Sequence, residues 1–244
     1  MTLTPTWDQL DRDCELLPEE LRHRSRRYLK NHQQRYESDL RLVERFYRGG
    51  RVLEIGAAPC QLIRALQLQG YPVQAVDLNP DRFLPIIRKY ALPVVQCDIE
   101  REPLPFERAR FSLILFNEVF EHLRMDPIAT LAEIHRVLRP GGSLVPSTPN
   151  LYSLKSIASF LRGRGFGDPY QEFQKLHSLG HMGHVRVYTA DQIKRFLAGA
   201  GLQSIEVRYR FHKSRRRVLG LAMNLANQIF LKCRPYQVHI STAG

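Results

Sequence analysis

Three ionisable side chains in the segment FNEVFEHL could act together on a hydroxyl group. Glu118, Glu121 and His122 are spaced i, i+3 and i+4, which brings them to one face if the segment is helical. Carboxylate and imidazole groups suit a divalent cation such as Mg or Mn, and such a cation lowers the pKa of a hydroxyl bound to it. The spacing therefore predicts a metal or acid–base site. The structural alternative is that these residues only anchor a helix.

A second group of residues is suited to holding a nucleoside. The segment VLEIGAAPC ends in a turn of small residues, where backbone amides can approach a ligand closely. Asp77, in the segment VDLNP, offers a carboxylate that can accept hydrogen bonds from a ribose diol. The turn lacks the third glycine of GxGxxG, which argues against a pyrophosphate site.

The elements around these residues predict where the two groups meet. Apolar runs indicate five strands, at 51–56, 71–80, 92–99, 110–117 and 143–149. Helical patterns alternate with them, at 60–70, from Pro80, from Glu118 and at 126–138. This alternation predicts an α/β doubly wound fold, a parallel sheet with helices on both faces. Ligands bind such sheets at the carboxyl ends of the strands, so both groups are expected at one edge.

The flanks are expected to complete this domain, over residues 49–244. Residues 19–47 predict a helix in two pieces, within an N-terminal helical cap at 1–48. A basic, glycine-interrupted insertion at 150–187 is long enough to suggest a functional role. The remaining elements are expected to be a helix at 188–201 capped by Thr189, a strand at 202–211, an amphipathic helix at 213–232 after a basic cluster, and an edge strand at 236–241.

Composition and charge exclude several classes of protein. The chain has 244 residues, of which 43% are hydrophobic and 25% charged, as in ordinary globular domains rather than disordered or disulfide-rich chains. No apolar run reaches the ~20 residues of a membrane span. Four scattered cysteines and an acidic N-terminus without an apolar core suggest a cytoplasmic protein with reduced thiols. Of the net charge of +12, residues 151–244 carry +11, which indicates a surface for an anionic partner or a solvated basic face.

The order of five segments resembles that of the class I S-adenosylmethionine (SAM) methyltransferases, over about residues 48–210. These segments are VLEIGAAPC, VDLNP, QCDIE, FNEVFEHL and LRPGGSL. The resemblance implies a Rossmann-like, seven-stranded, mostly parallel sheet, methyltransferase activity and SAM as cofactor. Ala58 and Cys60 stand where the family usually has its second and third glycines. Because alanine adds only a methyl group, we expect binding to survive, the alternative being a non-catalytic binding protein on this fold.

The resemblance also assigns the cofactor-binding positions. They are expected at Glu54, Gly56, Ala57, Ala58, Pro59, Asp77, Leu78, Asp98, Ile99 and Asn117. Asp77 matches the ribose-binding acid, Asp98 and Ile99 match the adenine edge, and Asn117 lies beside the amino-acid end of the cofactor.

The arrangement of Glu118, Glu121 and His122 looks like that of ubiquinone-biosynthesis O-methyltransferases and of small-RNA 2′-hydroxyl methyltransferases. In those families it is associated with a divalent metal. His184, in HVRVYTADQI, occupies a position comparable to a later histidine of the RNA enzymes. The resemblance thus implies a metal site of Glu118, Glu121, His122 and His184, with His122 and His184 as catalytic residues.

The acceptor is expected to be a polar, anionic or carrier-linked small molecule or glycan, methylated on oxygen. This follows from a resemblance of residues 148–165 and 183–202 to bacterial methyltransferases of glycan and small-metabolite pathways, with Arg162, Arg164 and Arg186 as candidate anion contacts. The amphipathic segment at 213–232 suggests contact with a membrane surface or a lipid carrier, or else packing against the domain. The other alternative, a nucleic-acid methyltransferase, is weakened because aromatic residues are not interleaved with the basic run.

Overall fold

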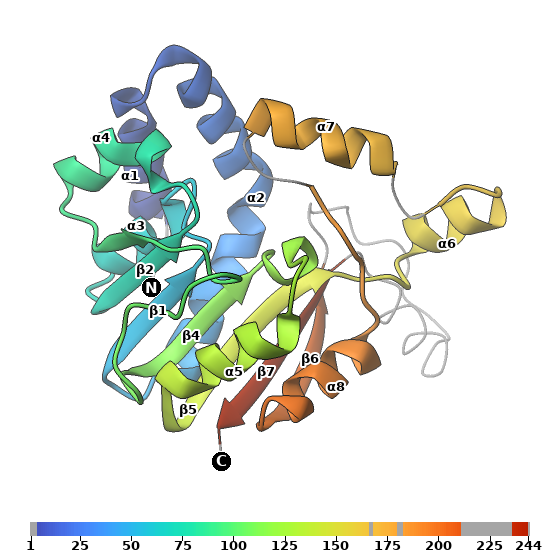
Figure 1. The fold of residues 1–244 in the computed structure, drawn as a ribbon. Coiled ribbons are helices and arrows are strands. Elements are labelled where there is room, and N and C mark those ends of the chain that lie inside the picture. The colour runs from blue at the N-terminus through green and yellow to red at the C-terminus, as the bar shows by residue number, and fades with distance from the viewer. Residues whose placement is uncertain (1–3, 166–167, 180–182, 211–235, 244) are drawn as a thin grey trace, which may run out of the picture.

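The computed structural model describes residues 4–165, 168–179, 183–210 and 236–243. In this part of the chain, seven strands form one sheet in the order β3-β2-β1-β4-β5-β7-β6 (Figure 1). The strands are β1 (Arg51–Ile55), β2 (Val73–Asp77), β3 (Val94–Gln96), β4 (Phe111–Asn117), β5 (Leu138–Pro149), β6 (Leu202–Arg210) and β7 (Tyr236–Ala243). The predicted Rossmann-like sheet is confirmed. The amphipathic helix expected at 213–232 lies outside the described residues.

Strand β7 differs from its predicted place. Neighbouring strands from β3 to β5 pair in parallel, whereas β7 runs antiparallel between β5 and β6. The expectation of an edge strand at 236–241 is therefore wrong, because β6 forms that edge. Val238, His239 and Ile240 are each at most 1% exposed, as interior strands covered on both faces require.

Helices cover both faces of the sheet, and the alternation of side chains along the strands divides the core in two. The helices are α1 (Thr4–Asp13), α2 (Glu19–Phe46), α3 (Gln61–Leu68), α4 (Leu84–Lys89), α5 (Pro127–Val137), α6 (Leu154–Leu161), α7 (Pro169–Leu179) and α8 (Ala190–Gly199). On β4, Leu113 and Leu115 belong to the core formed with α1 to α4. Ile114 and Phe116 belong to the core formed with α5 and α8, since successive side chains point to opposite faces.

The N-terminal cap is built on one long helix rather than the two predicted pieces. Helix α2 runs without interruption for 28 residues. The polar stretch KNHQQR in its middle lacks apolar positions, but Lys, Gln and Arg are good helix formers and neither Gly nor Pro interrupts it. Leu29, Leu40 and Val43 are buried in the same cluster as β1 and β4, so the cap is part of the domain core.

The segment after β4 is not the expected helix. Glu118 has a left-handed backbone (φ 56°), and only one 3-10 turn, η3 (Phe120–His122), follows before α5. Helix α5 then starts at Pro127, where the Asp126 side chain accepts hydrogen bonds from Ile128 N and Ala129 N at 2.9 and 3.0 Å. The common helical face expected for Glu118, Glu121 and His122 is therefore wrong.

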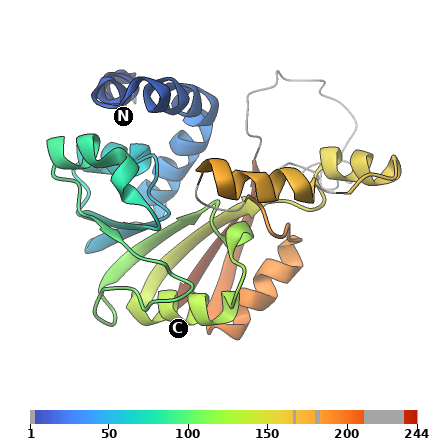
Figure 2. The same ribbon diagram turned by 45° about the horizontal axis from the view of Figure 1, so that its top comes forward.

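The insertion and its flanks surround the carboxyl edge of the sheet. Figure 2 shows α7 lying across this edge, with α2 on one side and α6 on the other. The following helix, α8, begins with the predicted Thr189 cap, whose Oγ1 accepts from Gln192 N, and the Thr189 N–H donates in return to Gln192 Oε1. Within the insertion, α6 has no buried residue, so it contributes nothing to the core.

Candidate functional site

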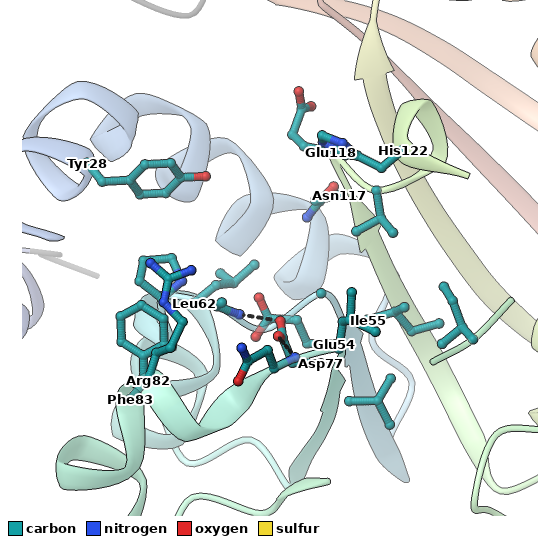
Figure 3. Close-up of a pocket in the computed structure, with 18 of the residues that line it drawn as sticks. Tyr28, Glu54, Ile55, Leu62, Asp77, Arg82, Phe83, Asn117, Glu118 and His122 are labelled. Carbon is teal, nitrogen blue, oxygen red and sulfur yellow. Dashed lines mark hydrogen bonds between the residues drawn. The ribbon is translucent and has the colours of Figure 1, made fainter. Parts of the chain in front are cut away.

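A cavity of about 540 Å³ opens at the carboxyl edge, where β1, β2 and β4 end beneath α2 (Figure 3). The strand register explains why. Ile55 pairs with Val76 on one side and Phe116 on the other, so the residues that follow these three emerge at one level. The volume lies in the range of small-molecule sites.

Almost all of the predicted cofactor positions line this cavity. They are Glu54, Gly56, Ala58, Pro59, Asp77, Leu78, Asp98, Ile99 and Asn117. Ala57 does not line it: this side chain is 2% exposed and packs in the core. The sheet thus brings together residues from four loops, and their contact with a cofactor stays a prediction.

The turn after β1 is shaped by Gly56. Its φ of 83° is one that other residues rarely adopt, and a Cβ placed on it would lie 2.4 Å from Val119 Cγ2. Glycine therefore lets the loops after β1 and β4 pack directly on one another. Cys60, the residue directly before α3, has φ 66°, in a position where glycine was expected from the family pattern. Burial raises the pKa of its thiol, which keeps the thiol protonated.

Asp77 connects the loops that follow β1 and β2. Its Oδ2 accepts a hydrogen bond from Ala58 N at 2.8 Å, and its Oδ1 accepts one from Asn79 N at 2.9 Å. Each carboxylate oxygen has a second lone pair, so Asp77 can still accept hydrogen bonds from a vicinal diol. These contacts hold the carboxylate at the cavity wall.

Several polar atoms at the inner end of the cavity have no hydrogen-bond partner among the described residues. They are Glu54 Oε2 and both amide atoms of Asn117, all of them buried. Burial raises the pKa of Glu54 well above its usual range, opposed by the charge of Arg35 and assisted by that of Asp77. Leaving such groups unpaired costs about 1–3 kcal/mol each. They fit a ligand that brings its own donors and acceptors, such as the amino-acid end of the expected cofactor.

A candidate metal group lies beside this end of the cavity. One ligand atom each from Glu121, His122 and His184 lie within 4.8 Å of one another. Glu118 is not a member, contrary to the sequence prediction. Its left-handed backbone turns the carboxylate toward Ser147 Oγ, at 2.7 Å, and Arg210 Nη2, at 3.6 Å.

Backbone contacts hold these three residues together. The N–H groups of Val185 and Arg186 donate to the Glu121 carbonyl at 2.8 and 3.3 Å, which places His184 next to η3. The Nδ1 atom of His122 lies 3.0 Å from the Gly183 carbonyl oxygen. Because a carbonyl only accepts, Nδ1 is the donor, and the lone pair of the neutral ring is on Nε2.

The carboxylate of Glu121 is suited to a cation. It accepts a hydrogen bond from Thr148 Oγ1 at 3.0 Å, but its other oxygen is buried without one, 3.8 Å from His184 Nε2. Burial raises the pKa of Glu121 well above its usual range, with Glu118 adding to the effect. Partial removal from water lowers the pKa of His184. A neutral imidazole and a buried oxygen are what a divalent cation needs.

Sequence analysis missed one wall of the cavity. Helix α2 presents Arg24, Tyr28, His32 and Arg35 to it, at spacings of three or four residues that keep them on one face. The helical spacing of these residues can be seen in the sequence, but the sequence does not show that this face of α2 lies over the carboxyl edge of the sheet. The anion contacts predicted in the insertion, Arg162, Arg164 and Arg186, are not on the wall and are exposed.

Comparison with known proteins gives the relatives of this chain. A family model described as a methyltransferase domain matches residues 21–207. A ubiquinone biosynthesis O-methyltransferase from Xylella fastidiosa is 33% identical over 118 residues, 46% of each chain. A malonyl-[acyl-carrier protein] O-methyltransferase from Erwinia billingiae is 28% identical over 139 residues, 55% of this chain and 53% of that one. The matches span only about half the length of these relatives.

Solved structures share the fold. A SAM-dependent methyltransferase from Archaeoglobus fulgidus superposes with a TM-score of 0.59 at 16% identity, over 86% of this chain and 94% of that one. A Burkholderia thailandensis N1-methyltransferase, solved with S-adenosylhomocysteine, gives a TM-score of 0.58 at 18% identity, over 91% and 83%. At such identities these likenesses concern the arrangement of helices and strands alone.

Proposed function

This chain belongs to the class I SAM-dependent methyltransferase family, and we propose that it transfers the methyl group to an oxygen of a polar, anionic or carrier-linked acceptor. The main support for this proposal is the position of Glu121, His122 and His184, at the end of a cavity lined by the predicted cofactor residues. A general base or a metal is useful when the acceptor is a hydroxyl. The malonyl and ubiquinone enzymes among the relatives are named O-methyltransferases, which supports transfer to oxygen.

Residues from both sides of the cavity would hold SAM. Asp77 would accept hydrogen bonds from the ribose diol, Asp98 and Ile99 would contact the adenine, and Gly56, Glu54 and Asn117 would contact the amino-acid end. All of these residues line the cavity, which supports the proposal. Bound there, SAM supplies a methyl carbon on a sulfonium that is already a good leaving group. The protein therefore has mainly to align the acceptor oxygen and exclude water.

The cofactor site is tested with the variant Asp77→Ala. Loss of the carboxylate should weaken binding of S-adenosylhomocysteine at least 30-fold in calorimetry while the circular dichroism spectrum is unchanged. Asp81→Ala is the control, because Asp81 is exposed four residues further on and is not on the cavity wall. Unchanged affinity in Asp77→Ala would contradict the site.

We propose that the acceptor hydroxyl meets His122 and His184. Either imidazole could take its proton, or the two could hold a divalent cation together with Glu121. Such a cation, when bound, lowers the pKa of the hydroxyl. The buried, unpaired oxygen of Glu121 and the ring orientation of His122 support the second role.

Chelation separates these two roles. If a cation is used, a chelator should suppress methyl transfer, and added Mg or Mn should restore it. Direct binding of Mn can be followed by electron paramagnetic resonance, with Glu121→Gln as the variant that removes it. Full turnover in the chelator would assign His122 and His184 to proton transfer alone.

We propose that the insertion contacts a membrane surface or carrier, in addition to the segment 213–232 predicted for this role, which lies outside the described residues. Exposed apolar side chains on α6 and α7, Leu154, Leu161, Tyr170 and Phe173, lie in a stretch that also carries Lys155, Arg162 and Arg164. Apolar groups among basic ones favour an anionic lipid surface. Among the described helices, none has both the length and the apolar character of a membrane span.

Vesicle flotation tests this contact. The protein should float with vesicles that contain anionic phosphatidylglycerol and stay behind with neutral ones. Leu161→Asp should abolish flotation, whereas Leu68→Asp, at an exposed position on α3, should not. Equal behaviour of the two variants would contradict the contact.

The acceptor itself is found by labelling. Incubation with radiolabelled SAM and fractionated extract should transfer label to the small-molecule, glycan or lipid fraction. Label in RNA would favour the nucleic-acid alternative. Absence of SAM binding altogether would favour a non-catalytic binding protein.

A further inference from the structure

One peptide group is held between the insertion and the candidate catalytic residues. It joins Gly183 to His184. Its N–H donates to Oε2 of Glu172, in α7, at 2.8 Å, and its carbonyl oxygen accepts from Nδ1 of His122 at 3.0 Å. The N–H and C=O of a planar trans peptide point in opposite directions. Glu172 and His122 therefore bind opposite sides of the same group.

Further contacts keep Glu172 beside this peptide. Its backbone carbonyl accepts from Gly183 N at 3.1 Å, and its carboxylate pairs with Lys175 Nζ at 2.5 Å. Gly183 is buried, and a Cβ built on it would lie 1.5 Å from Glu172 Oε2. The lack of a side chain at Gly183 is thus what lets the carboxylate reach the His184 N–H.

A charged acceptor on one side of the peptide strengthens the hydrogen bond on the other side. A hydrogen bond to an ionised carboxylate is about twice as strong as one between neutral groups, and hydrogen bonds in a chain polarise one another. The Glu172 carboxylate therefore makes the Gly183 carbonyl oxygen a better acceptor for the Nδ1–H group of His122. A proton kept on Nδ1 leaves the lone pair of the neutral ring on Nε2.

We propose that Glu172 is a positioning residue of the methyl-transfer site, which acts on His122 through the Gly183–His184 peptide group. A carbonyl that accepts from a working histidine sets the tautomer and orientation of the ring, and here a carboxylate holds that carbonyl in place. The inference rests on the proposed function, in which Nε2 of His122 meets the acceptor hydroxyl or a cation. It gives α7, which lies across the carboxyl edge (Figure 2), a part in the chemistry.

The first test reads the tautomer of His122 directly. With nitrogen-15 in the histidines, the NMR spectrum at pH 8, where an ordinary imidazole is neutral, distinguishes a proton on Nδ1 from one on Nε2. The signals of His122 are those lost in His122→Asn. The unmodified protein should carry the proton on Nδ1. Glu172→Ala should give a mixture of both tautomers, and Glu172→Gln, which keeps an acceptor oxygen, should recover the Nδ1 form in part.

A neighbouring substitution provides the matched control. Gln171→Ala should leave the His122 signals unchanged, because Gln171 is exposed on the same helix. A proton on Nε2 of His122 in the unmodified protein would overturn the proposal. An unchanged tautomer in Glu172→Ala would also overturn it.

The variant Gly183→Ala tests the same contact from the other side. The added methyl group should displace the carboxylate, because the atoms nearest to it belong to the flexible side chains of Glu172 and Lys175. This variant should lose the Nδ1 tautomer as far as Glu172→Ala does, and the double variant should lose no more. Losses that add in the double variant would overturn the proposal.

Methyl transfer shows whether this tautomer matters for the reaction. With radiolabelled SAM and fractionated extract, Glu172→Ala should transfer label 10- to 100-fold more slowly. Its affinity for S-adenosylhomocysteine in calorimetry should stay within 3-fold, because Glu172 does not line the cofactor cavity. A full rate with an altered tautomer would overturn the positioning role alone. Absence of S-adenosylhomocysteine binding in the unmodified protein would overturn the proposed function together with this inference.

Discussion

At the scale of single residues, two glycines have the same backbone strain but different amounts of free space around them. Gly56 and Gly70 have nearly the same φ, 83° and 80°, but a Cβ on Gly56 would meet Val119 at 2.4 Å, whereas nothing lies within 4 Å of one on Gly70. We predict that Gly70→Ala costs about 1 kcal/mol of unfolding free energy. Gly56→Ala should cost about 3 kcal/mol, because overpacking is added.

Urea denaturation measures the two costs, and calorimetry with S-adenosylhomocysteine measures the site. Only Gly56→Ala should weaken binding, by 10-fold or more. The loops after β1 and β4 must move apart to make room for the alanine side chain, and this movement would distort the cavity. Equal losses of stability in the two variants would show that the contact with Val119 is not tight.

His239 predicts how stability depends on pH. It is fully buried on β7, and burial lowers its pKa to about 4, helped by Lys194 on α8 and opposed by Asp191. The unfolded chain, with a pKa of about 6.5, binds the proton first as the pH falls. Stability is therefore complete above about pH 6.5 and declines toward pH 4, with about 2 kcal/mol lost by pH 5.

Unfolding by urea at pH 7 and pH 5 checks this dependence. In His239→Leu the difference between the two pH values should shrink by about 2 kcal/mol. The control is His23→Leu, at an exposed position on α2, which should keep the full difference. An unchanged difference in His239→Leu would assign the acid sensitivity to other groups.

Residue types predicted much of the candidate site. Glu54, Gly56, Asp77, Asp98 and Asn117 follow or end strands, and parallel strands deliver such residues to one edge. The cavity-lining side chains of α2 could not be found in this way, because their position depends on the direction in which α2 crosses the sheet. Glu118 was misplaced for a local reason: its left-handed φ of 56° replaces the helix that the i, i+3 and i+4 spacing assumed.

At the scale of elements, α2 is joined to the sheet by two ion pairs of different kinds. Arg210 of β6 binds Asp39, which is fully buried, and also donates to Ser147 Oγ of β5 at 2.9 Å. Arg45 of α2 binds Glu206 of β6 at 3.1 Å on the surface. We predict that Arg210→Ala costs about 3–5 kcal/mol, because it leaves a buried charge unpaired. Arg45→Ala should cost less than about 1 kcal/mol.

Chemical denaturation and limited proteolysis compare these two variants. Cleavage within α2 should become faster only in Arg210→Ala, because the buried pair holds the helix to the carboxyl edge. Stability losses of the same size in both variants would mean that Asp39 finds another partner.

The elements themselves were predictable to different degrees. Strongly apolar strands such as β4, and the Thr189 cap of α8, were predicted correctly, since each has a local signal. The place of β7 could not be predicted: pairing partners depend on contacts between distant parts of the chain, and the segment alone resembles an edge strand. The continuity of α2 was missed because the apolar pattern fades over its middle turns.

At the scale of the whole molecule, the N-terminal cap and the sheet form one folding unit. Leu10, Leu40 and Val43 are buried in the same cluster as Val52 and Ile240. We predict that a fragment of residues 49–244 does not fold by itself, because one face of the sheet would lose its cover. Near-ultraviolet circular dichroism and calorimetry with S-adenosylhomocysteine would report the loss.

The control for this truncation is a protein cleaved between the cap and the sheet, in which both pieces are still present. Cleavage at a protease site engineered between the exposed Gly49 and Gly50 should leave the cap bound to the rest, with the fold intact. A fragment of residues 49–244 that folds and binds ligand would instead identify the cap as a separate unit.

The position of the last strand has a consequence for truncation of the protein. Strand β7 lies between β5 and β6, and its register with β6 runs from Leu202 opposite Ala243 to Arg210 opposite Tyr236. In the described sheet β6 has no other neighbour. Removal of the final eight-residue strand would therefore leave β6 without any backbone hydrogen bonds to the sheet, so two strands would be lost instead of one.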